Sequence, residues 1–198
     1  MLSVLDRRLT LWHVWLLNVI ALAWFAGMLL ATQSSLPGVK LFRCPIGLCL
    51  GYYTPLELHA TLTRIGAEGR QFLLQTLLPL DMVLPFLVLA ALTLTYAWYS
   101  RPANGTTVPL SRGARYALMC TPLAYCAADY AENWALAEVL AAYPNVPYRL
   151  ARRASFLTAA KSQLIVASVG IAVALVVAAW GLAHRSRNGG NRHAQGPS

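Results

Sequence analysis

The feature that most constrains the fold is a set of four long runs of apolar residues separated by more polar stretches. A helix rises about 1.5 Å per residue, so about 20 residues cross the hydrocarbon core of a bilayer. The expected spans are 11–31, 77–99, 116–140 and 156–183. The sequence therefore predicts an all-α fold: a polytopic membrane protein whose single domain, residues 1–183, is a four-helix transmembrane bundle.

The composition agrees with this membrane class. Of the 198 residues, 58% are hydrophobic and 12% are charged, whereas a soluble domain has about half and about a quarter. The net charge of +9 comes from Lys and Arg residues between and after the apolar runs, where anionic lipid headgroups attract them. Since no basic patch with interleaved aromatic residues lies outside these runs, the expected partner is the lipid bilayer and not nucleic acid.

The first run is expected to be a permanent anchor and not a cleaved signal. Its apolar stretch of about 20 residues exceeds the roughly 7–15 of a signal peptide, and Trp12, Trp15 and Trp24 suit a span. The basic residues expected on the two sides of the bundle are equal in number, so the flanking Arg7 and Arg8 decide the orientation. They favour both termini in the cytoplasm, with the protein in the plasma (inner) membrane.

The predicted outer loop, residues 32–76, contains a helix signal of its own. Thr54-Pro55-Leu56-Glu57 is a capping box with proline at the first helical position. Apolar residues follow at i, i+4 and i+7 from Leu58 to Ile65, and Gly66 supplies a stop. This pattern predicts an amphipathic helix on the outer membrane surface or over the mouth of the bundle. A second short helix, 67–75, is expected to lead into the second span.

The most informative residues are polar side chains inside the predicted spans, where a charge costs about 2.5–3.5 kcal/mol on insertion scales. Asp129, Glu132 and Asn133 lie at i, i+3 and i+4, so they share one face of the third span. Tyr125 lies on the same stripe. Two carboxylates this close repel each other, so a proton or a cation is expected to accompany them.

Two further charges come from other spans. Asp81 lies in the second span between Pro79 and Pro85, and Pro85 has no N–H to donate to the Asp81 carbonyl. Lys161 lies in the fourth span, and Arg152 precedes it toward the outer end. At about 1.5 Å per residue, the three acids and Lys161 lie about 7–16 Å inside the outer ends of their helices. They are expected to meet in the outer half of the bilayer, with Arg152 at the mouth.

Such a cluster has a structural and a functional interpretation. Polar side chains between membrane helices stabilise packing by about 0.6–2 kcal/mol per bond, and a single residue of this kind is most often structural. Four converging ionisable groups exceed that need and favour a binding site. The candidate ligand-binding residues are Asp81, Asp129, Glu132, Asn133, Lys161, Tyr125 and Arg152. The expected ligand is a lipid or small amphipathic molecule from the outer leaflet: carboxylates would bind its cationic or hydroxylated group, and Lys161 would balance charge or take an anionic headgroup.

The same residues belong to a set of short motifs spread over residues 51–168. The motifs are Tyr53-Thr54-Pro55-x-Glu57, Gly66-x-x-Gly69-Arg70, Asp81 with Pro85, Asp129-Tyr130-x-Glu132-Asn133, and Thr158 with Lys161. In these motifs the chain resembles a widespread family of small, uncharacterised bacterial four-span membrane proteins. The resemblance implies a four-span fold with a shared polar cluster, and it brings no established activity with it.

Three alternatives to ligand binding stay open. Paired acids and a lysine also suit a proton- or cation-coupled transporter, which in a four-span chain would require a homo-oligomer. In a structural accessory subunit the same residues would only fix packing. Thiol redox catalysis is disfavoured because no Cys-x-x-Cys motif is present. Cys44 and Cys49 suit a small-loop disulfide, whereas Cys120 and Cys126 lie about 120° apart on one helix and cannot pair with each other.

The sequence indicates no cofactor and leaves open whether the protein is an enzyme. The four His residues are scattered, and no two of them have metal-ligand spacing, so no metal is expected. No glycine-rich phosphate loop or serine-nucleophile motif is present. Residues 184–198 are polar, Gly-rich and basic, which predicts a disordered tail.

Overall fold

The computed structural model describes residues 10–36, 52–101 and 107–193, and its regular structure in these ranges is all helical. The all-α class predicted above is therefore confirmed. The elements are α2 (Leu11–Ser35), α3 (Pro55–Arg64), α4 (Gly66–Phe72), the π-helical η1 (Leu73–Leu77), α5 (Leu78–Asp81), α6 (Leu84–Tyr99), α7 (Arg112–Ala142) and α8 (Tyr148–His193).

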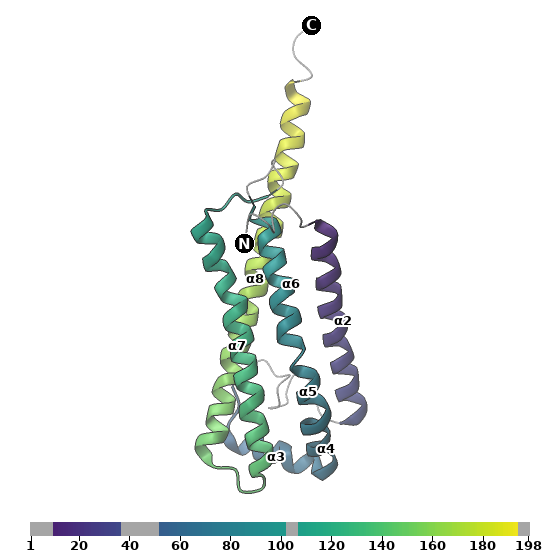
Figure 1. Ribbon diagram of the computed structural model, residues 1–198, viewed down its shortest axis with the longest axis vertical. Helices are drawn as coiled ribbons and strands as arrows, with labels where there is room; N and C mark the ends of the chain where they lie inside the picture. The colour runs from purple at the N-terminus through teal and green to yellow at the C-terminus, as the bar shows by residue number, and fades with distance from the viewer. Residues whose placement is uncertain (1–9, 37–51, 102–106, 194–198) are drawn as a thin grey trace.

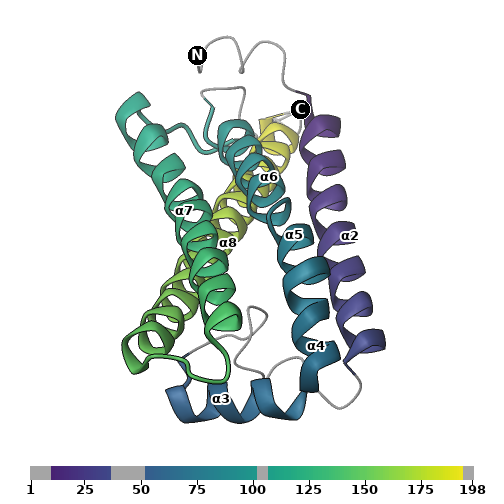
Figure 2. The same ribbon diagram turned by 60° about the horizontal axis from the view of Figure 1, so that its bottom comes forward.

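The long helices form an up-and-down bundle in which successive segments run in opposite directions (Figure 1). Helix α7 packs most extensively on α8, and α6 lies against α2, α7 and α8. Helix α2 stands at the edge of the bundle beside α6. The short helix α3 crosses one end of the bundle, as Figure 2 shows from below.

Within the described residues, three helical stretches are long and apolar enough to cross a membrane. They are Leu11–Ser35, Gly66–Tyr99 and Tyr148–Arg185, which contain the first, second and fourth predicted spans. Helix α7 has 31 residues and holds the third predicted span. It does not meet the same criterion of length and composition, because polar and charged residues interrupt its apolar sequence.

The second predicted span is not one continuous helix. A π-helical turn, Leu73–Leu77, precedes α5, and the regular α-helical hydrogen bonding is interrupted at Met82 and Val83 before α6 begins, although both residues keep right-handed helical backbone angles. Pro85 explains this break, because it lacks the N–H that would continue the helical hydrogen bonding to the carbonyl of Asp81. Asp81 is therefore the last residue of a short helix in the middle of the Gly66–Tyr99 stretch.

Side chains from two other helices donate to carbonyls beside this break. The indole Nε1 of Trp24 on α2 donates to the carbonyl of Leu80 at 3.1 Å. The hydroxyl of Tyr130 on α7 donates to the carbonyl of Met82 at 2.9 Å. These bonds supply the hydrogen-bond donors that backbone carbonyls need where a helix is interrupted in an apolar environment.

Helix α3 begins as the capping box predicts. The hydroxyl of Thr54 accepts from the N–H of Glu57 at 3.2 Å, and the Glu57 carboxylate accepts from the N–H of Thr54 at 2.7 Å. The backbone N–H and the hydroxyl of Thr54 both donate to the Glu57 carboxylate, which holds the pKa of this exposed carboxyl below its ordinary value. Leu58 and Leu62 are buried against the bundle. Gly66 ends the helix at φ +70°, a conformation that glycine adopts without strain.

Proline also occurs inside α7, yet the helix continues through it. Pro122 leaves the carbonyl of Leu118 without its usual donor, and the hydroxyl of Thr121 donates to that carbonyl at 2.9 Å. Helix α8 contains no proline and extends to His193. This differs from the disordered tail predicted from His184, because an established helix adds residues at little further cost.

Two apolar clusters flank a polar layer along α7 and α8. The first joins α3 to the bundle and includes Leu136 of α7 and Ala151 of α8. The second lies nearer the other end and joins Tyr96 of α6 to Leu175 of α8. Except for Arg115, the buried polar residues of α7 and α8 fall between these clusters in the sequence of each helix.

Candidate functional site

The centre of the polar layer is an ion pair shared by three side chains. The ammonium Nζ of Lys161 on α8 lies 2.6 Å from Oδ1 of Asp129 on α7. The same ammonium pairs with Oε2 of Glu132, one helical turn further along α7. Asp129 and Glu132 are 0% exposed and Lys161 is 8% exposed. The i, i+3 spacing of the two acids thus gives Lys161 two carboxylates on one helix face.

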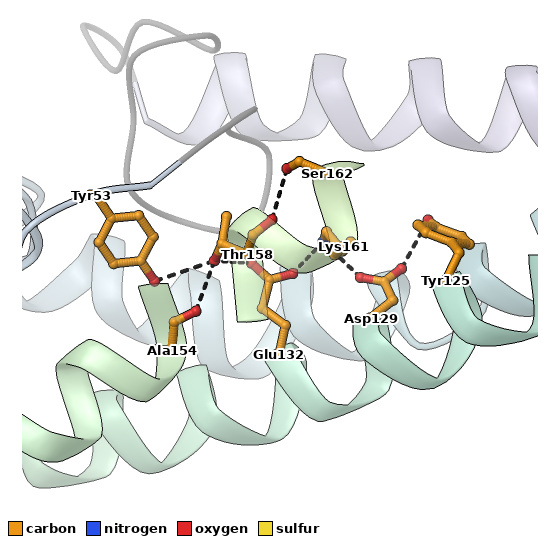
Figure 3. Close-up of polar contacts among 8 residues, drawn as sticks. All are labelled: Tyr53, Tyr125, Asp129, Glu132, Ala154, Thr158, Lys161 and Ser162. Atoms are coloured by element: carbon orange, nitrogen blue, oxygen red, sulfur yellow. Dashed lines mark hydrogen bonds and ion pairs between the residues drawn. The ribbon is translucent and has the colours of Figure 1, made fainter. Parts of the chain in front are cut away.

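The two carboxylates depend on Lys161 in the same way. Neither Oδ1 of Asp129 nor Oε2 of Glu132, the two oxygens that face the ammonium, has a hydrogen bond to any other residue. The second oxygen of Asp129 accepts from the hydroxyl of Tyr125 at 3.0 Å. The second oxygen of Glu132 accepts from the hydroxyl of Thr158. Figure 3 shows these contacts in one row between α7 and α8.

Tyr53 extends the row toward α3. The hydroxyl of Thr158 lies 3.4 Å from the Tyr53 hydroxyl (Figure 3). The Tyr53 backbone is held by Ser155, whose hydroxyl accepts from its N–H at 3.0 Å and donates to its carbonyl at 2.5 Å. The segment before α3 is therefore fastened to α8 one helical turn from Lys161.

Asp81 and Asn133 form the other side of the site. Asp81 is 7% exposed and interacts through its charge with Lys161, Asp129 and Glu132. Among the described residues it has no ion pair within 4 Å. The side-chain amide of Asn133 faces the Asp81 carboxylate and is 0% exposed. In the part of the chain that the structure describes, neither polar atom of that amide has a hydrogen-bond partner within 3.5 Å.

The site contains more acid than base. Counting only described residues and taking all groups as ionised, the carboxylates of Asp81, Asp129 and Glu132 face one ammonium, that of Lys161, for a formal charge of −2. Burial of uncompensated charge costs several kcal/mol per ion on the order-of-magnitude scale of buried pairs. The arrangement therefore favours uptake of protons or of a positively charged group.

The structure brings together six of the seven residues predicted for the site. They are Asp81, Tyr125, Asp129, Glu132, Asn133 and Lys161. Arg152 is not among them: its side chain is exposed. The next residue, Arg153, pairs instead with Glu138 at 3.5 Å on the outside of the bundle. Arg152 lies more than two helical turns before Lys161 and on a different face of α8, which explains why it does not reach the cluster.

Two polar contacts were absent from the predicted site. Thr158 precedes Lys161 by three residues, so its place on the same helix face was readable from helical periodicity. Tyr53 precedes the capping box in the sequence, and no periodic signal connects it with α8. Only the folding of the segment before α3 onto Ser155 brings it to the cluster.

The described residues contain no group of three His, Cys, Asp or Glu side chains arranged to hold a metal ion. Cys120 and Cys126 are free thiols, exposed and buried respectively. Cys44 and Cys49, the pair predicted to suit a disulfide, lie outside the described residues.

Comparisons of the chain with protein-family models, curated proteins and solved structures gave no match. The family resemblance and the role of the cluster therefore stay predictions, and they rest on the chemistry of the side chains described above.

Proposed function

We propose that the chain is a four-span membrane protein and that α7 is the span that the apolar criterion misses. Between Arg112 and Glu138, no exposed or half-exposed residue of α7 carries a charge. The three charged residues in that interval, Arg115, Asp129 and Glu132, are buried. The interval is about 37 Å long at about 1.5 Å per residue, which exceeds the hydrocarbon thickness of about 30 Å.

In this arrangement α3 lies at the outer surface of the plasma (inner) membrane and both termini lie in the cytoplasm. The flanking Arg7 and Arg8 support this orientation. The antiparallel order of α2, α6, α7 and α8 supports an even number of crossings (Figure 1). Labelling of single cysteines in cells tests it: a cysteine at Leu56, on the exposed side of α3, should react with a membrane-impermeant maleimide, and a cysteine at Arg112 should not.

The function that the site supports best is binding of the cationic or hydroxylated group of a lipid or small amphipathic molecule from the outer leaflet. The observation that carries this proposal is the excess of three buried carboxylates over one ammonium. Lys161 is already engaged by Asp129 and Glu132, so its role here is to balance charge and not to take an anionic headgroup.

Mass spectrometry of the gently purified protein tests this function. Wild-type protein should retain a lipid or metabolite that the Asp129→Asn, Glu132→Gln double variant loses. Glu138→Gln is the matched control, because Glu138 lies on the same helix but is partly exposed and pairs with Arg153 outside the bundle. Equal retention by all three proteins, at unchanged thermal stability, would leave the cluster without a binding role.

Transport of protons or a small cation is the second candidate. It is favoured by the complete burial of Asp129, Glu132 and Thr158, since a proton needs far less space than a headgroup. A chain of this size would act as a homo-oligomer. Flux measured in proteoliposomes separates the two functions: a cation gradient dissipated by wild type but not by the double variant supports transport.

A further inference from the structure

Asp81 is the carboxylate of the cluster whose charge is least compensated. Lys161 contacts both Asp129 and Glu132 within 4 Å but not Asp81. Tyr125 and Thr158 donate to the other two acids, at Asp129 and Glu132 respectively. Asp81 interacts with the ammonium only at longer range, and two like charges oppose it from α7.

Asn133 supplies an independent observation at the same place. Its amide is 0% exposed and faces the Asp81 carboxylate. Among the described residues, neither Nδ2 nor Oδ1 has a hydrogen-bond partner within 3.5 Å, although the amide interacts with Asp81. A buried amide without partners costs about 1–3 kcal/mol per unsatisfied group, and native proteins rarely leave one without a use. With the amide nitrogen turned toward the carboxylate, the oxygen is an acceptor that lacks a donor.

We propose that Asp81 and Asn133 form a subsite for a protonated primary amine. The proposal rests on the function proposed above and names the chemical group that the site binds. The Asp81 carboxylate lacks a paired positive charge, and the Asn133 oxygen lacks an N–H donor. A primary ammonium supplies both. A quaternary ammonium carries the same charge but has no N–H, so it can neutralise Asp81 without satisfying Asn133.

The break in the second span places this subsite near the lipid. Met82 and Val83, which directly follow Asp81 in the sequence, are each 40% exposed on the surface of the bundle. Phe86, on the next turn, is 62% exposed. When the apolar chain of an amphipathic amine packs against these residues, its ammonium group lies beside Asp81, which directly precedes Met82 in the sequence. The ammonium can come from the headgroup of an aminophospholipid or from a free alkylamine.

Native mass spectrometry at neutral pH tests the subsite with four probes. Dioleoyl phosphatidylethanolamine is compared with dioleoyl phosphatidylcholine, and dodecylamine is compared with dodecyltrimethylammonium. We expect each primary amine to bind wild-type protein about tenfold more tightly than its trimethylated counterpart, the effect of one charge-assisted hydrogen bond. Selectivity for the phospholipid alone, for dodecylamine alone, or for both supports the subsite and identifies the source of the amine.

Variants assign the selectivity to the two residues. Asp81→Asn should weaken binding of both primary amines about tenfold or more, and Asn133→Leu should remove the preference over the trimethylated probes. Glu138→Gln should retain both properties. The comparison of probes on wild-type protein needs no variant, so poor folding of a variant does not decide the outcome.

The results separate this inference from the function on which it rests. If amphipathic molecules bind in a manner that depends on Asp129 and Glu132 but without preference for primary amines, the subsite is wrong and the binding function stands. If none of the four probes binds and no molecule is retained on purification, both are wrong.

Discussion

Helices α2 and α7 are both long enough to cross a bilayer, yet their side chains contact very different surroundings. Helix α2 has large apolar residues exposed on several sides, with Leu22 and Leu30 each 67% exposed, and it stands at the edge of the bundle (Figure 1). Between Arg112 and Glu138, helix α7 exposes only uncharged residues, and it buries Asp129, Glu132 and Asn133 at 0% exposure.

This difference shows that hydropathy and packing carry separate information in a membrane bundle. The uniform apolar character of α2 makes it a candidate span but does not specify which face meets a neighbour. Because of its polar residues, α7 fails the criterion of an apolar span. The same residues specify its inner face, because charges are costly against acyl chains. The contrast predicts larger effects for substitutions on the α7 and α8 interface than for substitutions on α2.

The largest effect is expected for Lys161→Met. It leaves Oδ1 of Asp129 and Oε2 of Glu132 buried without any partner. Removal of one member of a buried ion pair costs about 3–5 kcal/mol. Unfolding by detergent titration in mixed micelles measures the change in free energy. The control is Arg153→Met, which breaks the pair with Glu138 outside the bundle and should cost less than about 1 kcal/mol. Equal effects would show that burial does not distinguish the two pairs.

A smaller effect is expected for Tyr130→Phe, which removes the hydrogen bond to the Met82 carbonyl at the break. The expected loss is about 1 kcal/mol, because one backbone carbonyl loses its donor from α7. Tyr116→Phe is a matched control on the same helix, since Tyr116 is also exposed and its hydroxyl has no hydrogen bond among the described residues. A loss of stability in the control as large as in Tyr130→Phe would contradict this role.

On α2 the expected effect is smaller again. Asn18 donates to the hydroxyl of Thr95 on α6 at 3.1 Å. A double-mutant cycle with Asn18→Leu and Thr95→Val should give a coupling of about 0.6 kcal/mol, the average for polar contacts between membrane helices. A coupling above about 2 kcal/mol would break the comparison, because α2 would then depend on polar contacts as strongly as α7 does.

The smallest effect is expected for Glu57, an exposed carboxylate outside the long helices. It shows how an acid in contact with solvent behaves, for comparison with the buried acids. Its pKa is lowered from 4.5 by hydrogen bonds from Thr54, so the folded helix favours the ionised form. The contribution of the ionised Glu57 carboxylate to the stability of α3 is complete above about pH 4.5, and it is lost as the pH falls through the lowered pKa. Amide hydrogen exchange at the start of α3 should accelerate in that range relative to the rest of α3. Glu57→Gln should abolish this pH dependence.

Much of the cluster was readable from spacing. Asp129, Glu132 and Asn133 share a face because the helix repeats every 3.6 residues, and Thr158 lies one turn before Lys161 for the same reason. The meeting of α7 with α8 at this level was also expected from counting residues inward from the ends of the helices. Arg152 is exposed and lies outside the cluster, so a role for it at the mouth of the site stays a prediction.

By itself, the sequence determined the helical class, the capping box at Thr54, the stop at Gly66 and the inner face of α7, since each depends on residues close together in the chain. Only the tertiary structure decided that Lys161 pairs with Asp129 and Glu132 while Asp81 faces Asn133. It also decided that Tyr53 reaches Thr158 and that Trp24 and Tyr130 cap the break. The physical reason is that these contacts depend on how each helix is rotated and shifted against its neighbours. Those rotations result from the packing of all the side chains together and not from any local pattern.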